Sequence, residues 1–555
     1  MAHYLSTGKK KTGEKSRYAI NMSDLGTFKL INGLGQRYFD VLSQNLDDIH
    51  QLDTTSGEME SNGTVLNRSI QLAESLTKRG VKEGDIVVIS SRSHSDETIV
   101  ILACLFIGAI LAPIDMDAVY NDWIALIGKL RPKIGFCDLR AVSQLDRSLI
   151  LFGLSGEIVV FGDLNIGNKT LFSTMFLDPP NQQFTPVDIA DPSNQIAFIL
   201  PTQGTAGPMK LVCLSHLNVL VRTMLLIEVM GRPQRLLSYY TLPYGMQCMV
   251  ICASFESNIT RFMPGAFNER NCCKIIHDLH IDLMILNTQY CRLLCRNVAI
   301  KDFDLSSLKK VIIGGTYTGK EDLVHFNGTL PTVQFIQVYN LQETGIIAAT
   351  PIREYQDSMK KLMSCGKILP FSKVKIVDIN TGEELGPRHM GHIYFSGESL
   401  MLGYLTKRTS INFMKQDYFM TEDVGKFDEQ GWLYQEGRLE DVVTGLDNSG
   451  YRFTVREVEG IIKGYAIVLD AVVIGNETDI VCCVVKRPDS NLQIDKLKTF
   501  VDARLPPYKR PSKYLIYDSF PMTSLGKIKR YILREEVFHI KLCVVDSLAE
   551  IYIPM

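Results

Sequence analysis

Short apolar runs rich in β-branched residues alternate with stretches of helical character along this chain. Two examples are residues 85–90, which read DIVVIS, and residues 157–161, which read EIVVF. Strands that alternate with helices are typical of parallel sheets covered by helices. The sequence therefore predicts an α/β fold, and a length of 555 residues predicts about three or four compact units.

Composition narrows the class of protein. Hydrophobic residues make up 46% of the chain and charged residues 22%, as in ordinary globular proteins. The formal net charge of −2 provides no basic field for nucleic acid or for an anionic membrane. Thirteen cysteines without paired CxxC spacing indicate neither a disulfide framework nor a zinc site. We therefore expect reduced thiols in a reducing compartment, and no nucleic-acid partner.

The longest apolar stretch runs from Ile99 to Pro113 and is too short to span a membrane. We expect it to form a buried helix that starts at Ser95, Asp96 and Glu97, because acidic residues suit a helix start. No integral membrane segment is predicted. Residues 1–25 contain three consecutive lysines, at 9–11, in polar sequence without an apolar signal core, and we expect a flexible tail there.

A short loop, residues 201–210, follows the apolar run 195–200 and reads PTQGTAGPMK. Its glycines allow close backbone approach to an anion, its hydroxyls can donate hydrogen bonds, and Lys210 adds positive charge. The loop is not a Walker P-loop, because Met209 precedes the lysine and Leu211 follows it. Taken alone, it fits an ordinary turn after a strand as well as a phosphate site.

Six segments in order resemble the signature motifs of the adenylate-forming superfamily, which includes acyl-CoA synthetases, 4-coumarate:CoA ligases and firefly luciferases. The segments are 201–210, 311–316 (VIIGGT), 337–344 (QVYNLQET, similar to QGYGLTET), 391–405 (similar to GEI…GY), 421–441 (TED…GRLED, similar to TGD…GRxxD) and 520–530 (similar to PxTxxGKxxR). Chance agreement of six motifs in order is negligible. The resemblance covers residues 202 to 530, and the preceding part fits the family's length.

The resemblance implies a large N-terminal domain, residues 26–437, made of parallel sheets covered by helices together with a small barrel-like lobe. It implies a small, mobile α+β C-terminal domain, residues 438–535, and leaves the structure of residues 536–555 open. The chain ends without the Ser-Lys-Leu-type peroxisomal signal of many relatives. We expect a cytoplasmic or peroxisomal location, and the oligomeric state stays open.

The resemblance also implies ATP, Mg²⁺ and coenzyme A as reactants and cofactors, with a small carboxylic acid as substrate. A carboxylate is a poor electrophile, and joining it to AMP supplies a leaving group that a thiol can displace. Phosphates would be held by Thr202, Gly204, Thr205, Gly207 and Lys210. The adenine, acyl and remaining nucleotide contacts would come from Gly315, Thr316, Gln337, Val338, Tyr339 and Gln342.

The charged roles implied by the resemblance fall on a few residues. Glu343 would bind Mg²⁺, Asp423 would accept hydrogen bonds from the ribose, and Arg438 would reinforce the ribose and phosphate side. Lys527 would stabilise the charge that develops during adenylation, and Gly450 would admit the pantetheine arm of coenzyme A. Lys527, Glu343 and Lys210 are thus the catalytic candidates. Taken singly, such residues are more often caps, exposed side chains or turns.

Several positions depart from the family's pattern. Gln203 and Ala206 remove hydroxyl donors, Gln342 replaces a threonine beside the phosphates, and Thr444 replaces a lysine used in the second half-reaction. We expect reduced activity, with adenylation more secure than transfer to coenzyme A. The alternatives are a catalytically weakened relative that binds nucleotide or acyl groups, and a luciferase-like monooxygenase.

Two further positions leave a structural and a functional reading open. The turn around Tyr244 and Met246 could form an apolar wall that favours a fatty or aryl acid, or it could be a simple buried turn. His216 matches a Ser-His pair of the family, although a capped helix start explains it almost as well.

Overall fold

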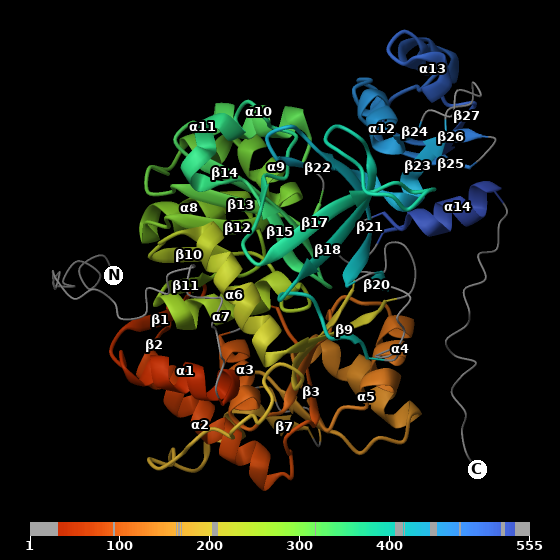
Figure 1. Ribbon diagram of the computed structural model, residues 1–555. Coiled ribbons are helices and arrows are strands. Elements are labelled where there is room, and N and C mark those ends of the chain that lie inside the picture. The colour runs from red at the N-terminus through yellow and green to blue at the C-terminus, as the bar shows by residue number, and fades with distance from the viewer. Residues whose placement is uncertain are drawn as a thin grey trace, which may run out of the picture.

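A computed structural model describes residues 32–538, apart from 93–94, 163, 165–166, 168, 203–208, 317, 406–413, 416, 445–451, 477–478 and 523–527. Two large sheets, one antiparallel lobe and a smaller C-terminal part make up the structure (Figure 1). The predicted fold class is confirmed. The expected tail at residues 1–25 lies outside the described residues, and the proposed domain boundaries stay predictions.

The first large sheet has nine strands and is parallel at its centre. Antiparallel strands flank it on both sides. Its strands in spatial order are β16 (Lys367–Ile368), β15 (Gly345–Ala349), β14 (Gln334–Leu341), β13 (Lys310–Gly314), β12 (Leu283–Asn287), β10 (Arg235–Ser238), β11 (Thr260–Met263), β1 (Ile49–Asp53) and β2 (Met59–Ser61).

The second large sheet has eight strands. It is parallel except where β9 pairs with β8 and β19. Its strands in order are β19 (Gly403–Tyr404), β9 (Leu211–Ser215), β8 (Ile196–Pro201), β4 (Ile110–Pro113), β3 (Ile86–Ser90), β5 (Ile134–Cys137), β6 (Glu157–Val160) and β7 (Thr170–Leu171). The strands expected at 85–90, 157–161 and 195–200 are therefore present as β3, β6 and β8.

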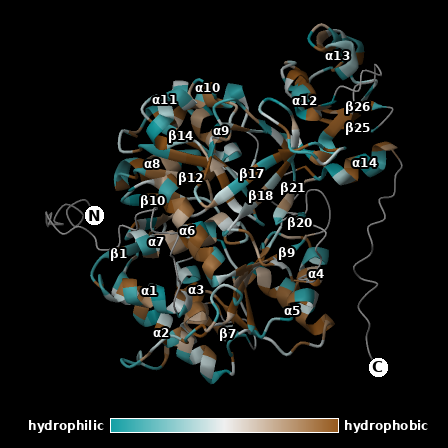
Figure 2. Ribbon diagram, in the orientation of Figure 1, coloured by the Kyte–Doolittle hydropathy of each residue, from teal (hydrophilic) through white to brown (hydrophobic). Residues whose placement is uncertain are grey.

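Helices lie between the two sheets and on their outer faces, so that five layers stack (Figure 1). The central layer packs one apolar cluster against both sheets and consists of α1 (Gly33–Ser43), α2 (Asn62–Lys78), α3 (Asp96–Phe106), α6 (His216–Met230) and α7 (Gly245–Ser257). The outer helices are α4 (Tyr120–Leu130) and α5 (Val142–Leu151) on one side, and α8 (Glu269–Leu279), α9 (Thr288–Arg296) and α10 (Lys320–Thr329) on the other. Figure 2 shows apolar residues concentrated on the sheets and the central helices.

The third sheet is the barrel-like lobe, and its strands pair antiparallel. It consists of β17 (Ser372–Val377), β18 (Gly391–Gly397), β20 (Met414–Lys415), β21 (Tyr418–Phe427) and β22 (Leu433–Arg438). The short helix α11 (Tyr355–Ser358) precedes it. The C-terminal part contains β23 (Val442–Thr444), β24 (Arg452–Thr454), α12 (Val455–Lys463), β25 (Val468–Gly475), β26 (Ile480–Lys486), α13 (Ile494–Asp502), β27 (Lys513–Tyr517) and α14 (Arg530–Phe538).

The single helix expected from Ile99 to Pro113 is wrong over its second half. Helix α3 ends at Phe106, and Ile110–Pro113 form β4 of the second sheet. Gly108 turns the chain between them with a φ of +70°, a conformation that glycine adopts without steric cost. Both elements are buried on all sides, so the apolar run has no periodicity that separates helix from strand.

The described residues contain no helix long and apolar enough to cross a membrane. Twelve cysteines lie in this part of the chain, all of them free and eleven of them buried. The expectation of unpaired thiols is therefore met for these residues.

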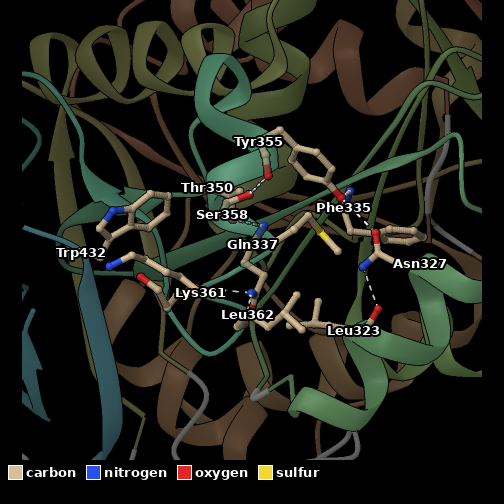
Figure 3. A pocket seen from close by; sticks show the side chains of 12 residues that line it. Leu323, Asn327, Phe335, Gln337, Thr350, Tyr355, Ser358, Lys361, Leu362 and Trp432 are labelled. Atoms are coloured by element: carbon tan, nitrogen blue, oxygen red, sulfur yellow. Dashed lines mark hydrogen bonds between the residues drawn. The ribbon is translucent and has the colours of Figure 1, made fainter. Parts of the chain in front are cut away.

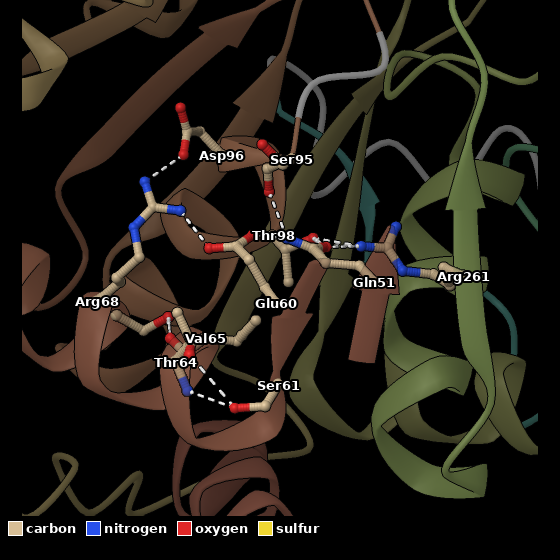
Figure 4. Close-up of polar contacts among 11 residues, drawn as sticks. Gln51, Glu60, Ser61, Thr64, Val65, Arg68, Ser95, Asp96, Thr98 and Arg261 are labelled. Carbon is tan, nitrogen blue, oxygen red and sulfur yellow. Dashed lines mark hydrogen bonds and ion pairs between the residues drawn. The ribbon is translucent and has the colours of Figure 1, made fainter. Parts of the chain in front are cut away.

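A buried network of charged and amide side chains joins the first sheet to the central helices (Figure 4). Arg261 of β11 donates to Gln51 of β1 at 2.5 Å and to Thr98 of α3, and Gln51 in turn donates to Glu60 at 2.5 Å. Arg68 of α2 completes the network through Glu60 at 2.5 Å and Asp96. Burial lowers the pKa of Arg261 to about 10, against the opposing effect of Glu97, so the guanidinium stays charged at neutral pH.

Replacing Arg261 with methionine should destabilise the protein strongly. The change leaves the buried Gln51 amide oxygen and Thr98 hydroxyl without their donor and removes the positive charge near Glu97 and Glu60. Removing one member of a buried charge network typically costs about 3–5 kcal/mol. The matched control is Arg270→Met, because Arg270 pairs with Asp302 at the surface, where such a loss costs about 1 kcal/mol or less. Thermal unfolding checks both variants, and equal midpoints for the two would contradict the role given to the network.

Candidate active site

The predicted phosphate loop connects β8 to β9 at the edge of the second sheet. The backbone N–H of Thr202 donates to the carbonyl of Lys210 at 2.8 Å, and the N–H of Lys210 donates to the Thr202 hydroxyl at 2.9 Å. These two bonds close the base of the loop. Gly204, Thr205 and Gly207, like the departures Gln203 and Ala206, lie outside the described residues, so their predicted phosphate contacts stay predictions.

Lys210 points from this loop toward the third sheet. Its ammonium group contacts Glu422 of β21 at 2.8 Å and lies 5.4 Å from the ring centre of Tyr404. The Tyr404 hydroxyl donates to Glu343 at 2.8 Å. Burial and the neighbouring Glu343 carboxylate raise the pKa of Tyr404, so its proton stays on the phenol. The structure thus brings Lys210 and the predicted metal ligand Glu343 into contact with the same tyrosine, one at its ring and one at its hydroxyl.

The backbone around Glu343 is held by a buried arginine, which the sequence analysis missed. Arg222 of α6 donates to the carbonyls of Gln342 at 2.8 Å, Glu343 at 2.7 Å and Ser399 at 2.8 Å. Burial lowers the pKa of Arg222 to about 9, and the Glu343 carboxylate opposes that shift. One sequence signal was available, because Arg222 is a lone charge in the apolar run LNVLVRTMLL.

Gln342 does not point into open space. Its side-chain amide donates to the carbonyl of Pro201 at 3.1 Å and to that of Pro243 at 3.2 Å. A Cβ atom on Gly245, the first residue of α7, would lie 2.8 Å from the Gln342 amide oxygen. The glutamine therefore ties the start of the phosphate loop to the turn that precedes α7, and a glycine at 245 makes room for it.

Replacing Gln342 with threonine should lower stability and should not raise adenylation. The shorter side chain loses both hydrogen bonds, each worth about 0.5–1.5 kcal/mol. Gln430→Thr is the matched control, since Gln430 is exposed in a turn of the third sheet. Thermal unfolding and pyrophosphate release check the two variants. A faster reaction in Gln342→Thr would show that the glutamine obstructs the site.

Asp423 is buried in the middle of β21, opposite the last residue of β22. Its carboxylate accepts hydrogen bonds from the Tyr339 hydroxyl at 2.7 Å and from the Gln435 amide at 3.2 Å, and Arg438 lies 3.4 Å away. Strand pairing places Asp423 directly opposite Arg438. Burial and the Asp423 charge raise the pKa of Tyr339 well above its usual range. Three predicted nucleotide ligands, Tyr339, Asp423 and Arg438, therefore meet at one point.

The strand and turn predicted to line the adenine and acyl pocket are β13 and the residues after it. Gly315 has a φ of +78°, and the carbonyl of Gly314 accepts a hydrogen bond from the Tyr240 hydroxyl at 3.0 Å. A Cβ atom on Gly314 would lie 2.6 Å from the Val338 side chain, so glycine is needed where β13 passes β14. Thr316 is exposed beside this turn.

Gln337 does not join the other predicted nucleotide ligands. Its amide donates to the carbonyl of Leu362 at 2.9 Å, and its backbone N–H donates to the Thr350 hydroxyl at 3.1 Å (Figure 3). These residues, together with Tyr355 and Trp432, line a small cavity with room for about one water molecule. Gln337 therefore contacts the segment that leads into the third sheet. Its predicted nucleotide contact stays a prediction.

The described end of the C-terminal lysine motif, residues 528–530, contacts α12 and lies near α4. Lys527 and Gly450 fall outside the described residues, and their roles stay predictions. Arg530 binds both carboxylate oxygens of Glu459 in α12, at 2.6 and 2.7 Å, and lies 3.6 Å from Asp441. Burial raises the pKa of Asp122 in α4 and the charge of Lys529 opposes that shift, so Lys529 lies within electrostatic reach of α4.

His216 is the first residue of α6 and is fully buried. Ser215 and Asn218 form a capping box at this helix start, and the backbone N–H of Leu34 donates to the His216 ring at 3.2 Å. Burial lowers the pKa of His216 to about 4. The observed contacts are those of a capped and packed helix start.

Neutral burial of His216 should make the protein sensitive to acid. The unfolded chain binds the proton near pH 6.5 and the folded chain only near pH 4, so stability falls as the pH drops through this window. The loss at pH 5.5 should be about 1 kcal/mol for this residue. His216→Gln should flatten the fall in thermal midpoint between pH 7.5 and 5.5, whereas His325→Gln, at an exposed position on α10, should leave it unchanged.

The described residues thus bring the base of a loop, a carboxylate–arginine pair and a candidate metal ligand close together within an α/β fold. The model of the AMP-binding enzyme family matches residues 52–405, and that of the AMP-binding enzyme C-terminal domain matches residues 457–527. The chain belongs to this family of adenylate-forming enzymes.

Curated relatives extend over most of the chain. A luciferin 4-monooxygenase of Photuris pensylvanica is 25% identical over 531 residues, which cover 90% of this chain and 94% of that protein. The 4-coumarate–CoA ligase-like protein 9 of Arabidopsis thaliana is 25% identical over 501 residues, 86% of this chain and 85% of that protein. The structure of ATP-bound MatB from Rhodopseudomonas palustris has the same fold, with a TM-score of 0.80 and 21% identity over 91% of this chain and 99% of that one.

Proposed function

We propose that this protein is an ATP-dependent acid:CoA ligase that works through an acyl-adenylate. The observation that carries the proposal is the chain of contacts from Lys210 through Glu422 to Arg438 and Asp423, with Glu343 joined to it through Tyr404. The cations Lys210 and Arg438 thus lie close to the carboxylates proposed for the ribose and for Mg²⁺. These residues come from the second sheet, the first sheet and the third sheet.

The proposed first step joins the acid to AMP. A carboxylate oxygen of the substrate attacks the α-phosphorus of ATP, a C(O)–O–P bond forms, and pyrophosphate leaves. Lys210 and Lys527 would neutralise the phosphate charge, and such electrostatic stabilisation is usually the largest catalytic contribution. In the second step the thiol of coenzyme A attacks the acyl carbonyl and AMP leaves. Gly450 would admit the pantetheine arm.

The residues present fit a magnesium ion and a ribose. Among the described residues no three acidic, histidine or cysteine side chains gather as a metal cage, and Mg²⁺ at nucleotide sites is commonly held by one or two carboxylates and the phosphates. Glu343 supplies such a carboxylate, and the ion would neutralise charge on the phosphates. Asp423 can accept a further hydrogen bond from a ribose hydroxyl, because a carboxylate offers about four acceptor sites and Tyr339 and Gln435 each use one.

The acid is proposed to be a fatty or aryl monocarboxylate. Tyr244 and Met246 are half-buried at the start of α7 and pack against the central apolar cluster. The Tyr244 ring lies 5.2 Å from that of Tyr240, whose hydroxyl contacts the Gly314 turn. An apolar wall next to the predicted acyl turn favours an apolar acid. We place the protein in a reducing compartment, the cytoplasm or the peroxisome, because its described cysteines are free.

Pyrophosphate release tests the proposal directly. The full chain is incubated with ATP and Mg²⁺ and a panel of fatty and aryl acids, with and without coenzyme A. Acid-dependent release establishes adenylation, and loss of free thiol establishes the second step. Light or oxygen uptake with an added luciferin would favour the monooxygenase. ATP binding without release for any acid would favour a weakened relative.

Replacing Lys527 with alanine should slow pyrophosphate release about 100- to 1000-fold, the usual cost of removing one group that stabilises transition-state charge. ATP affinity, measured by calorimetry, should change much less, since Lys527 acts on charge that develops during the reaction. Lys498→Ala is the control, because Lys498 is exposed on α13 of the same C-terminal part. Undiminished release in Lys527→Ala would reject the role of this lysine.

A further inference from the structure

A second carboxylate stands next to Asp423 in the site. Residues 421–423 read TED, whereas the family pattern that they resemble reads TGD, so Glu422 occupies the place of a glycine. Along β21, Thr421 and Asp423 are buried and Glu422 between them is half-exposed, with 50% of its side chain accessible. The strand therefore turns Asp423 inward and presents Glu422 to the opening of the site.

Glu422 contacts both cations of the predicted phosphate and ribose site. One carboxylate oxygen lies 2.8 Å from the Lys210 ammonium, and the other lies 3.8 Å from the Arg438 guanidinium. Lys210 and Arg438 lower the pKa of Glu422 although partial burial opposes the shift, so the carboxylate is ionised at neutral pH. The other titratable groups around it are Asp423, Glu343, Tyr404, His392 and Glu440.

This arrangement has a consequence for an incoming triphosphate. Phosphates that bind Lys210 share its ammonium with Glu422 or displace that carboxylate, and in both cases they lie beside its negative charge. Like charges within a few ångströms repel each other most strongly where partial burial weakens solvent screening. A divalent cation on the phosphates removes that repulsion, because it neutralises part of their charge and carboxylate oxygens are ligands that it accepts.

We infer that Glu422 makes this site selective for the metal-bound form of the nucleotide: it holds Lys210 in the empty site and disfavours triphosphate that arrives without its cation. Glu422 is a specificity-determining residue in this account. The inference rests on the proposed function, since it assumes that Lys210 binds the β- and γ-phosphates. It assigns to a departure from the family's pattern a role in nucleotide selection.

Calorimetry on the full chain tests this inference without any turnover. ATP affinity is measured with excess Mg²⁺ and again with EDTA. The quantity compared is the dissociation constant in EDTA divided by the dissociation constant in Mg²⁺. Glu422→Gly should tighten binding of metal-free ATP by about tenfold, which is about 1.4 kcal/mol, and change binding of the Mg²⁺ complex less than about threefold. The ratio should therefore fall severalfold in the variant.

Three controls separate charge from other causes. Glu422→Gln keeps the shape and backbone preference and should lower the ratio as Glu422→Gly does. Glu429→Gln removes an exposed carboxylate further along the same lobe and should leave the ratio unchanged. AMP has no β- or γ-phosphate, so its affinity should be nearly the same in wild type and both Glu422 variants.

The outcomes distinguish this inference from the proposed function. An equal ratio in wild type and Glu422→Gly, with ATP binding intact, overturns the inference and leaves the ligase proposal standing. A change in Glu422→Gly that Glu422→Gln does not reproduce also overturns it, because charge is then not the cause. A chain that binds no ATP in either buffer overturns both proposals.

Discussion

Arg222 ties the turn after β14 to the segment that leads into β19. Its guanidinium leaves the central helix α6 and donates to main-chain carbonyls of residues 342, 343 and 399. These carbonyls belong to the turn after β14 and to the segment that leads into β19. Burying the arginine costs desolvation free energy, and its three hydrogen bonds offset that cost only when their geometry is fixed. The position of Glu343, that of Tyr404 which donates to it, and that of Pro201 which Gln342 contacts all depend on that geometry.

Much of the fold could be predicted from the sequence, because its signals are local. Buried strands such as β3 and β8 carry apolar β-branched runs, and the six ordered motifs placed the sheets, the lobe and the small C-terminal part. The split between α3 and β4 was missed for a local reason as well. Residues 99 to 113 are buried on every side, and such a run shows no period, so only the turn at Gly108 marks the boundary.

The candidate site was less predictable, because its contacts join residues far apart in the sequence. Lys210 and Glu422 are 212 positions apart, and Tyr404 and Glu343 are 61 apart. Motif resemblance gave a role to one member of each pair, whereas the partners Glu422 and Tyr404 lie within matched motifs and were given none. Gln342 illustrates the same limit: the residue type suggested a damaged site, whereas its two hydrogen bonds show a side chain accommodated by Gly245.

The ion pair between Arg530 and Glu459 connects segments of the C-terminal part to one another. Arg530 stands three positions after Lys527 and donates two hydrogen bonds to Glu459 of α12. Because Asp441 also lies 3.6 Å away, Arg530 links the end of the lysine motif to the segment that follows Arg438. These contacts hold together helix α12, helix α14 and the start of the C-terminal part. A movement of the C-terminal part, which the family resemblance predicts, would therefore carry Arg530 and the end of the lysine motif along with α12.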